Sequence, residues 1–178
     1  VTAITAWIGD ESAATATYGD INTWDVSAIT DFSNLFQNKT SFDSDISSWN
    51  VSSGTDFSYM FESAEAFNQD ISSWTVNNGT DFSYMFSIAT AFNQDIRLWD
   101  VGNVEDFSGM FENAQLMQDN YGFNVTPDAS EFTGPRGYSF TTRDELDVAI
   151  ELWINDVRGA RITYGDINTW DVSAITDF

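Results

Sequence analysis

The chain contains no histidine and no cysteine among its 178 residues. It therefore lacks the commonest general base, the thiol nucleophile and the usual protein ligands of zinc, copper and iron. These absences argue against most metalloenzyme and catalytic-triad chemistry. The lack of cysteine is compatible both with a reducing cytosol and with a secreted fold that needs no disulfides. No apolar run reaches the roughly 18 residues of a transmembrane helix, so the sequence predicts no membrane span.

Basic residues are also scarce, with six Lys and Arg against 28 Asp and Glu, which gives a formal net charge of −22. A field of this sign repels phosphate backbones, so we expect no nucleic-acid partner. Cations and positively charged partners are favoured instead. The hydrophobic fraction of 42% and the aromatic fraction of 16% are ample for a folded core.

What the sequence does contain is a repeat of constant length, present in four copies in register. A fixed period between about 20 and 50 residues indicates a stacked repeat architecture. The recurring tryptophans are Trp24, Trp49, Trp74 and Trp99, and the phenylalanines are Phe36, Phe61, Phe86 and Phe111. A tryptophan row could be a platform for sugar stacking. Its constant phase with a valine two residues later favours an inward core ladder.

Two patterns within a repeat predict its secondary structure. Ile71, Trp74 and Val76 have the spacing of a leucine-rich-repeat strand, which predicts a short strand over 73 to 77. Apolar residues of the preceding copy stand at i, i+3, i+4 and i+7, the pattern of a short helix face; they are Phe57, Met60, Phe61 and Ala64. We therefore expect an α/β repeat solenoid, leucine-rich-repeat-like and right-handed, with one short parallel strand and one short helix per coil and a capping helix.

The segment "AFNQDISSWTVNNGTDFSYMF" at 66 to 86 resembles the BspA-like repeat family, a leucine-rich-repeat variant of about 25 residues found in surface proteins of bacteria, mycoplasmas and microbial eukaryotes. The resemblance covers roughly residues 18 to 117. Phe57, Phe82 and Phe107 stand where methionine is usual in the family. The resemblance implies extracellular display with an adhesive or scaffolding role, and it carries over no catalytic residue.

A second, longer period is visible because "ITYGDINTWDVSAITDF" at 162 to 178 repeats residues 16 to 32 at an offset of 146 with one change. Upstream, Trp153 corresponds to Trp7, and residues 142 to 145 form a capping box ahead of an amphipathic helix. The chain begins inside a helix and ends inside a new repeat, from which we expect a longer polypeptide. The predicted organisation is a truncated capping helix over 1–15, a repeat stack over 16–117, a connector over 118–140, a second capping helix over 141–161 and the next stack from 162–178.

A column of aspartates precedes the tryptophans: Asp20, Asp45, Asp70 and Asp95. At the roughly 5 Å spacing of neighbouring strands, adjacent like charges repel by about 0.8 kcal/mol even in water. The favoured interpretation is that each carboxylate accepts backbone N–H bonds in the turn before its strand. The alternative is a calcium ladder, because hard cations prefer carboxylate oxygens. No other cofactor is indicated.

Two further surface features concern partners. Alternation places small polar side chains on the outer face of the predicted sheet, for example Ser73 and Thr75, without the aromatic or arginine anchors of tight interfaces. This face could bind a glycan or a surface protein through weak contacts. Sequons for N-glycosylation occur at Asn38, Asn50, Asn78 and Asn124.

Paired carboxylates are the one catalytic arrangement that this composition permits. Catalytic pairs are singular and need unequal environments, whereas most acids here recur at equivalent sites. We therefore expect a protein that is not an enzyme: an extracellular or cell-surface structural module of a long tandem array, forming a filament, appendage or coat with neighbouring copies of itself. The alternative is an adhesin-type module that recognises a glycan or host protein through the polar face.

Overall fold

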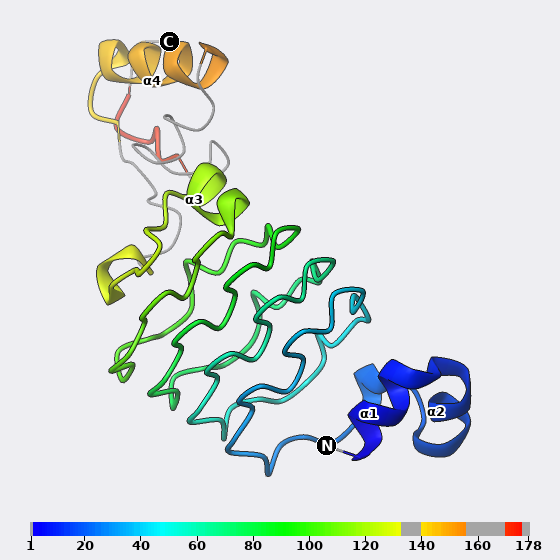
Figure 1. The fold of residues 1–178 in the computed structure, drawn as a ribbon. Helices are drawn as coiled ribbons and strands as arrows, with labels where there is room; N and C mark the ends of the chain where they lie inside the picture. The colour runs from blue at the N-terminus through cyan, green and yellow to red at the C-terminus, as the bar shows by residue number, and fades with distance from the viewer. Residues whose placement is uncertain (1, 133–139, 156–169, 176–178) are drawn as a thin grey trace.

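The computed structural model describes residues 2–132, 140–155 and 170–175. Helices α1 (Thr2–Gly9) and α2 (Glu11–Tyr18) lie at one end of the stacked repeats, and α3 (Gln115–Tyr121) lies at the other, before α4 (Arg143–Asn155) (Figure 1). Short 3-10 turns η1 (Ile21–Thr23) and η2 (Ala129–Glu131) complete the described elements. None of the helices in these ranges is long and apolar enough to cross a membrane.

The expected α/β solenoid is wrong, because the described residues contain no strand, and the repeats between residues 24 and 114 contain no helix. In place of strands, isolated parallel bridges connect successive repeats, at Asp31 with Asp56, Asp56 with Asp81, and Asp81 with Asp106. The strand expected over 73 to 77 is replaced by two turns. The N–H of Trp74 donates to Ile71 O at 3.1 Å, so it closes a turn instead of pairing with a neighbouring strand.

The helix expected over 57 to 64 is absent because Tyr59 and Ser63 have left-handed backbones, with φ of 57° and 56°. Alternate N–H groups donate to the next repeat, as in the bond from Phe61 N to Met85 O at 2.9 Å. The intervening groups close turns within the repeat, as in the bond from Met60 N to Phe57 O at 3.2 Å. An α-helix would need every N–H to reach the carbonyl four residues back. The backbone therefore bonds along the stack as well as around each repeat.

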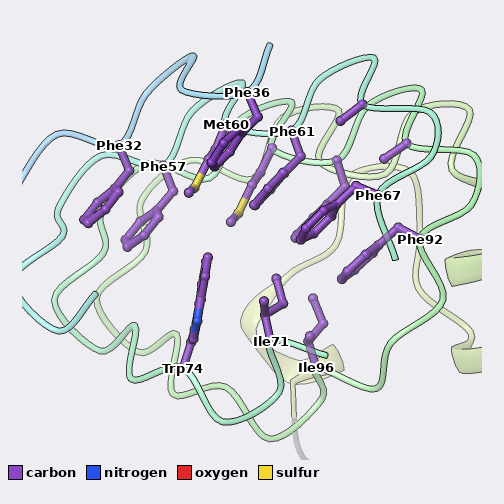
Figure 2. Close-up of a cluster of buried hydrophobic side chains, with 14 of the residues drawn as sticks. Phe32, Phe36, Phe57, Met60, Phe61, Phe67, Ile71, Trp74, Phe92 and Ile96 are labelled. Carbon is purple, nitrogen blue, oxygen red and sulfur yellow. The ribbon is translucent and has the colours of Figure 1, made fainter. Parts of the chain in front are cut away.

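Rings that recur every repeat form the core. Phe36 stacks on Phe61 with a centroid separation of 5.4 Å, and Phe61 stacks on Phe86 at 5.5 Å. A second row runs beside the first, in which Phe67 stacks on Phe92 at 5.8 Å (Figure 2). Within one repeat Phe61 also stacks on Phe67 at 4.1 Å. Because each ring touches the same residue of the next repeat, the core is continuous along the stack.

The end of the stack near α3 is closed by aromatic side chains from the segment predicted as a connector. The Phe132 ring stacks on Phe107 at 5.6 Å, and the Phe123 ring lies 4.7 Å from Phe111. Both side chains are buried. Residues through 132 thus belong to the same core as the repeats.

The opposite end is covered by α1 and α2, two helices where one was expected. Asp10 separates them, and its side chain accepts the N–H of Ala13 at 3.0 Å as the N-cap of α2. Trp7 of α1 is buried, and its indole N–H donates to Ser44 Oγ at 2.9 Å. Of the second capping helix predicted over 141–161, residues 156–161 lie outside the described residues; of the predicted stack 162–178, only 170–175 are described.

Candidate functional site

The tryptophan column lies mostly inside the stack. Trp49, Trp74 and Trp99 are buried, and each indole N–H donates to a carbonyl of the preceding repeat, from Trp49 to Ile21 O at 2.7 Å. Trp24 is only half-buried, which differs from the expectation for all four. It has α1 and α2 for neighbours in place of a preceding repeat, and it makes an edge contact with Trp7 at 5.7 Å. The second column, Phe36, Phe61, Phe86 and Phe111, is fully buried.

The aspartates at 20, 45, 70 and 95 each accept the backbone N–H two residues later, at 2.8, 2.9, 3.0 and 3.2 Å. Bonds from the hydroxyl and backbone of Ser72 lower the pKa of Asp70. Asp95 differs from the others because Arg97 pairs with it at 2.7 Å. That arginine is buried beneath the Tyr121 ring, 5.5 Å from its centroid. Within the ranges that the structure describes, no three acidic side chains come together in a group that could hold a metal ion.

A second aspartate column organises the bridges between repeats. Asp31, Asp56, Asp81 and Asp106 each accept the N–H of the serine two residues later, at 2.7 to 2.9 Å. The serine hydroxyl and backbone bonds lower the pKa of Asp31 and Asp106. Sequence reasoning did not identify this column. The recurring triplet Asp-Phe-Ser was the signal for a turn of this kind.

Asp56 offers a test of this column. Replacing Asp56 with Ala leaves the buried Ser58 without its acceptor for both N–H and hydroxyl, so we expect a loss of about 1–2 kcal/mol in unfolding free energy. Asp56→Asn keeps an acceptor oxygen and removes one charge from the column, so it should cost less than half as much. Urea denaturation measures both. Equal losses in the two variants would show that the bonds to Ser58 contribute nothing.

The small polar side chains predicted for the outer face do lie outside the stack. The side chains of Ser48, Asn50, Ser73 and Thr75 are exposed, and Leu98 is 73% exposed. Because the segments are not strands, these residues line successive turns and do not form a sheet surface. No aromatic or arginine side chain anchors this set.

All four sequon asparagines are exposed: Asn38, Asn50, Asn78 and Asn124. Two of them already use the amide nitrogen that would carry a glycan. Asn78 Nδ2 donates to Ser52 O at 2.8 Å, and Asn124 Nδ2 donates to Glu131 Oε1 at 2.9 Å. Attachment at these two positions would require those bonds to break.

An open cavity of about 630 Å³ lies where α1 and α2 meet the first repeat. Its lining is largely apolar, and sequence reasoning did not predict it. The lining includes Ala3, Trp24, Asp25, Val26 and Ile29. Ile29 is 44% exposed, although Trp24 and Val26 of the same lining pack against the core.

The same residues recur one long period later in a closed arrangement. Trp153 of α4 meets Trp170 at 5.8 Å and 84°, against 5.7 Å and 87° for Trp7 with Trp24. Four side chains are buried together beside Trp170 and Val172. They are Phe140, Leu146, Ala149 and Ile175.

Comparison with known proteins gave one family match. No curated protein and no solved structure matched the chain. A family profile described as "Mycoplasma protein of unknown function, DUF285" matches residues 9–123, which include α2, all four repeats and α3. This match covers well over half of the chain, so the chain belongs to the family of mycoplasma proteins of unknown function called DUF285.

Proposed function

We propose that the chain is a structural module of an extracellular or cell-surface protein in which such modules follow one another at the spacing that separates Trp7 from Trp153. The observation that carries this proposal is the recurrence of the helix-to-repeat junction. The pair Trp153 and Trp170 has nearly the separation and angle of Trp7 and Trp24. A second junction of the same geometry is what a tandem array requires, and a single binding domain has no need of it.

The bonding pattern of the repeats supports a mechanical role. Hydrogen bonds at alternate residues and rows of stacked rings both run along the stack, as at Phe57 N to Asp81 O and at Phe36 on Phe61. In repeat proteins of this kind, nearest-neighbour contacts dominate stability, so length can be added without a new core. The closing residues Phe123 and Phe132 end one stack before α4 begins the next.

Surface display and the absence of catalysis are part of the same proposal. The resemblance to the BspA-like repeats favours display outside the cell, and the recurrence of acidic residues at equivalent turns favours structural over catalytic use. The acids of both columns are engaged as acceptors in turns, as at Asp70 with Ser72 and at Asp56 with Ser58. The polar face, with its small side chains, supplies at most weak contacts to a glycan or protein.

The decisive experiment lengthens the protein. A chain in which residues 1–146 precede the full chain 1–178 should be monomeric and elongated, and its maximum dimension in small-angle X-ray scattering should increase by about one stack length over the parent. Scattering of the parent chain under the same conditions is the control. A longer chain that folds into a compact particle would contradict the array. Specific retention of the parent chain on a glycan or cell surface would favour the adhesin alternative.

The acidity predicts a response to divalent cations. With a net charge of −22 and no clustered metal site in the described residues, divalent ions should bridge or screen carboxylates without selectivity. We expect calcium and magnesium to raise the melting temperature equally, by about 2–4 °C relative to sodium at equal ionic strength, equivalent to roughly 1 kcal/mol. Thermal unfolding with chelator is the baseline. An increase with calcium alone would reveal a selective site.

A further inference from the structure

The open cavity beside Trp24 and the buried cluster beside Trp170 are built in part from equivalent residues. Four members of the closed cluster, Ala149, Trp170, Val172 and Ile175, correspond at the long-period offset to cavity-lining residues. Those counterparts are Ala3, Trp24, Val26 and Ile29. The local backbone is also the same, since Ile29 N donates to Val26 O at 2.9 Å and Ile175 N donates to Val172 O at 3.0 Å.

One difference between the two sites is the side chain that lies against Trp170 in the second one. Phe140 is fully buried, its ring centroid lies 5.1 Å from that of Trp170, and its N–H donates to Asp171 O at 2.9 Å. Asp171 corresponds to Asp25, which also lines the cavity. Among the described residues, no backbone N–H donates to the carbonyl oxygen of Asp25. The first site therefore has the lining and the acceptor, and the position equivalent to Phe140 falls before Val1, outside this sequence.

Equivalent residues are more exposed in the first site than in the second. Ile175 is 5% exposed beside Phe140, whereas Ile29 is 44% exposed beside the cavity. Ala149 is fully buried, whereas Ala3 is only half-buried. Removing apolar surface of this kind from water stabilises a fold, so the cavity is a site that gains from an apolar occupant.

The occupant in the second site is oriented by the start of α4. Glu145 Oε2 accepts the N–H groups of Thr141 and Thr142 at 2.9 and 3.3 Å, and Thr142 Oγ1 accepts the N–H of Glu145 at 3.3 Å. The predicted capping box is thus present, and it turns the chain so that Phe140 reaches back to Trp170 while Leu146 packs from the first turn of α4. Residues 140–146 form one docking unit.

We propose that the cavity lined by Trp24, Val26 and Ile29 is the receptor for the 140–146 segment of a preceding copy of the module, with Phe140 as the anchor. This inference rests on the proposed tandem array, because at the period of that array the segment stands directly before the residue equivalent to Val1. The ring of Phe140 covers Trp24 and Ile29, and the backbone N–H of Phe140 donates to Asp25 O. Each junction in the array is then held by a segment of the copy before it.

The test adds residues 140–146 in front of Val1 of the full chain and compares this protein with one whose added segment carries Phe140→Ala. Both extensions lengthen the helix and supply the capping box, so their difference isolates the anchor. Burying one phenylalanine should raise the unfolding midpoint by roughly 5 °C over the alanine control. Acrylamide quenching of tryptophan fluorescence should also fall in the first protein only, because Trp24 becomes covered.

Ile29→Asp provides the matched cavity variant. It should remove the gain from the phenylalanine extension, and the unextended chain with Ile29→Asp measures the cost of the substitution itself. Equal midpoints for the phenylalanine and alanine extensions would overturn the proposal, as would a gain that survives Ile29→Asp. Binding of a detergent or lipid probe that the phenylalanine extension fails to displace would assign the cavity to a different occupant and would also overturn it. These outcomes concern one junction in a single chain, so they are separate from failure of the longer chain to form an elongated array.

Discussion

Trp74→Ala should lower the free energy of unfolding by about 3–5 kcal/mol, the range for removing a large buried aromatic side chain. Trp74 is 4% exposed and lies 6.3 Å from the Phe61 ring (Figure 2). Its indole N–H also donates to Ile46 O at 3.3 Å, so the substitution removes a bond between repeats. Repeats on both sides hold the surrounding rings in place, and the resulting space cannot collapse easily.

Trp24→Ala is the matched control, because the same residue type at the same repeat position is half-buried beside the open cavity. It should cost clearly less than Trp74→Ala. Urea denaturation followed by far-ultraviolet circular dichroism measures both without relying on tryptophan emission. A loss below about 1 kcal/mol for Trp74→Ala, or equal losses for the two variants, would contradict the assignment of the tryptophan column to the core.

The sequence predicted which side chains point inward, and it failed on the backbone that presents them. Phe57, Met60, Phe61 and Ala64 are all fully buried. An i, i+3, i+4, i+7 pattern indicates only that these four side chains point to the same side of the chain. A chain that turns back every few residues through left-handed positions brings the same residues inward as a helix does. The period alone could not distinguish the two conformations.

A weak signal for the left-handed positions was present. The first of them falls on Asn34, Tyr59, Tyr84 and Gly109 in successive repeats, with φ between 55° and 60°. Asparagine and glycine tolerate this region, so the end repeats hinted at it. The two tyrosines concealed it, because a bulky residue rarely adopts a positive φ. Their rings stack on each other at 5.0 Å, and the stack position of Gly109 is filled by the Tyr84 ring.

The cavity could not be predicted from one copy of the repeat. Its lining residues look like ordinary core positions, and only Phe140 beside Trp170 reveals what is missing from the first site. In the sequence, Phe140 fell at the last position of the connector expected over 118–140. At the long-period offset, Trp153 and Trp170 are the counterparts of Trp7 and Trp24, but the contact within each pair was seen only in the structure. The position equivalent to Phe140 falls before Val1, outside this sequence.

Gly79→Ala should be strongly destabilising, with an expected loss of about 2–3 kcal/mol from overpacking. A Cβ at this position would lie 2.4 Å from Cε1 and 2.8 Å from Cζ of Phe82, and 3.1 Å from the backbone oxygen of Val76. Phe82 is fully buried and cannot swing away, because its ring makes edge contacts with Phe57 at 5.2 Å and Trp99 at 6.1 Å. The backbone would have to move instead, and the bond from Gly79 N to Val76 O at 2.8 Å would weaken.

Gly102→Ala is the control for this change, because its nearest neighbour to an added Cβ is Asp100 Oδ1 at 3.4 Å, an ordinary contact at an exposed position. It should be neutral or stabilise the fold by up to about 1 kcal/mol, since alanine restricts the unfolded chain. A flexible side chain in place of the Phe82 ring should relieve the clash. Gly79→Ala combined with Phe82→Met should therefore lose less stability than the sum of the two single variants. If the losses are additive, the cost of Gly79→Ala does not arise from Phe82. The close fit of glycine against phenylalanine would then not explain why glycine recurs at 54 and 79, three residues before Phe57 and Phe82.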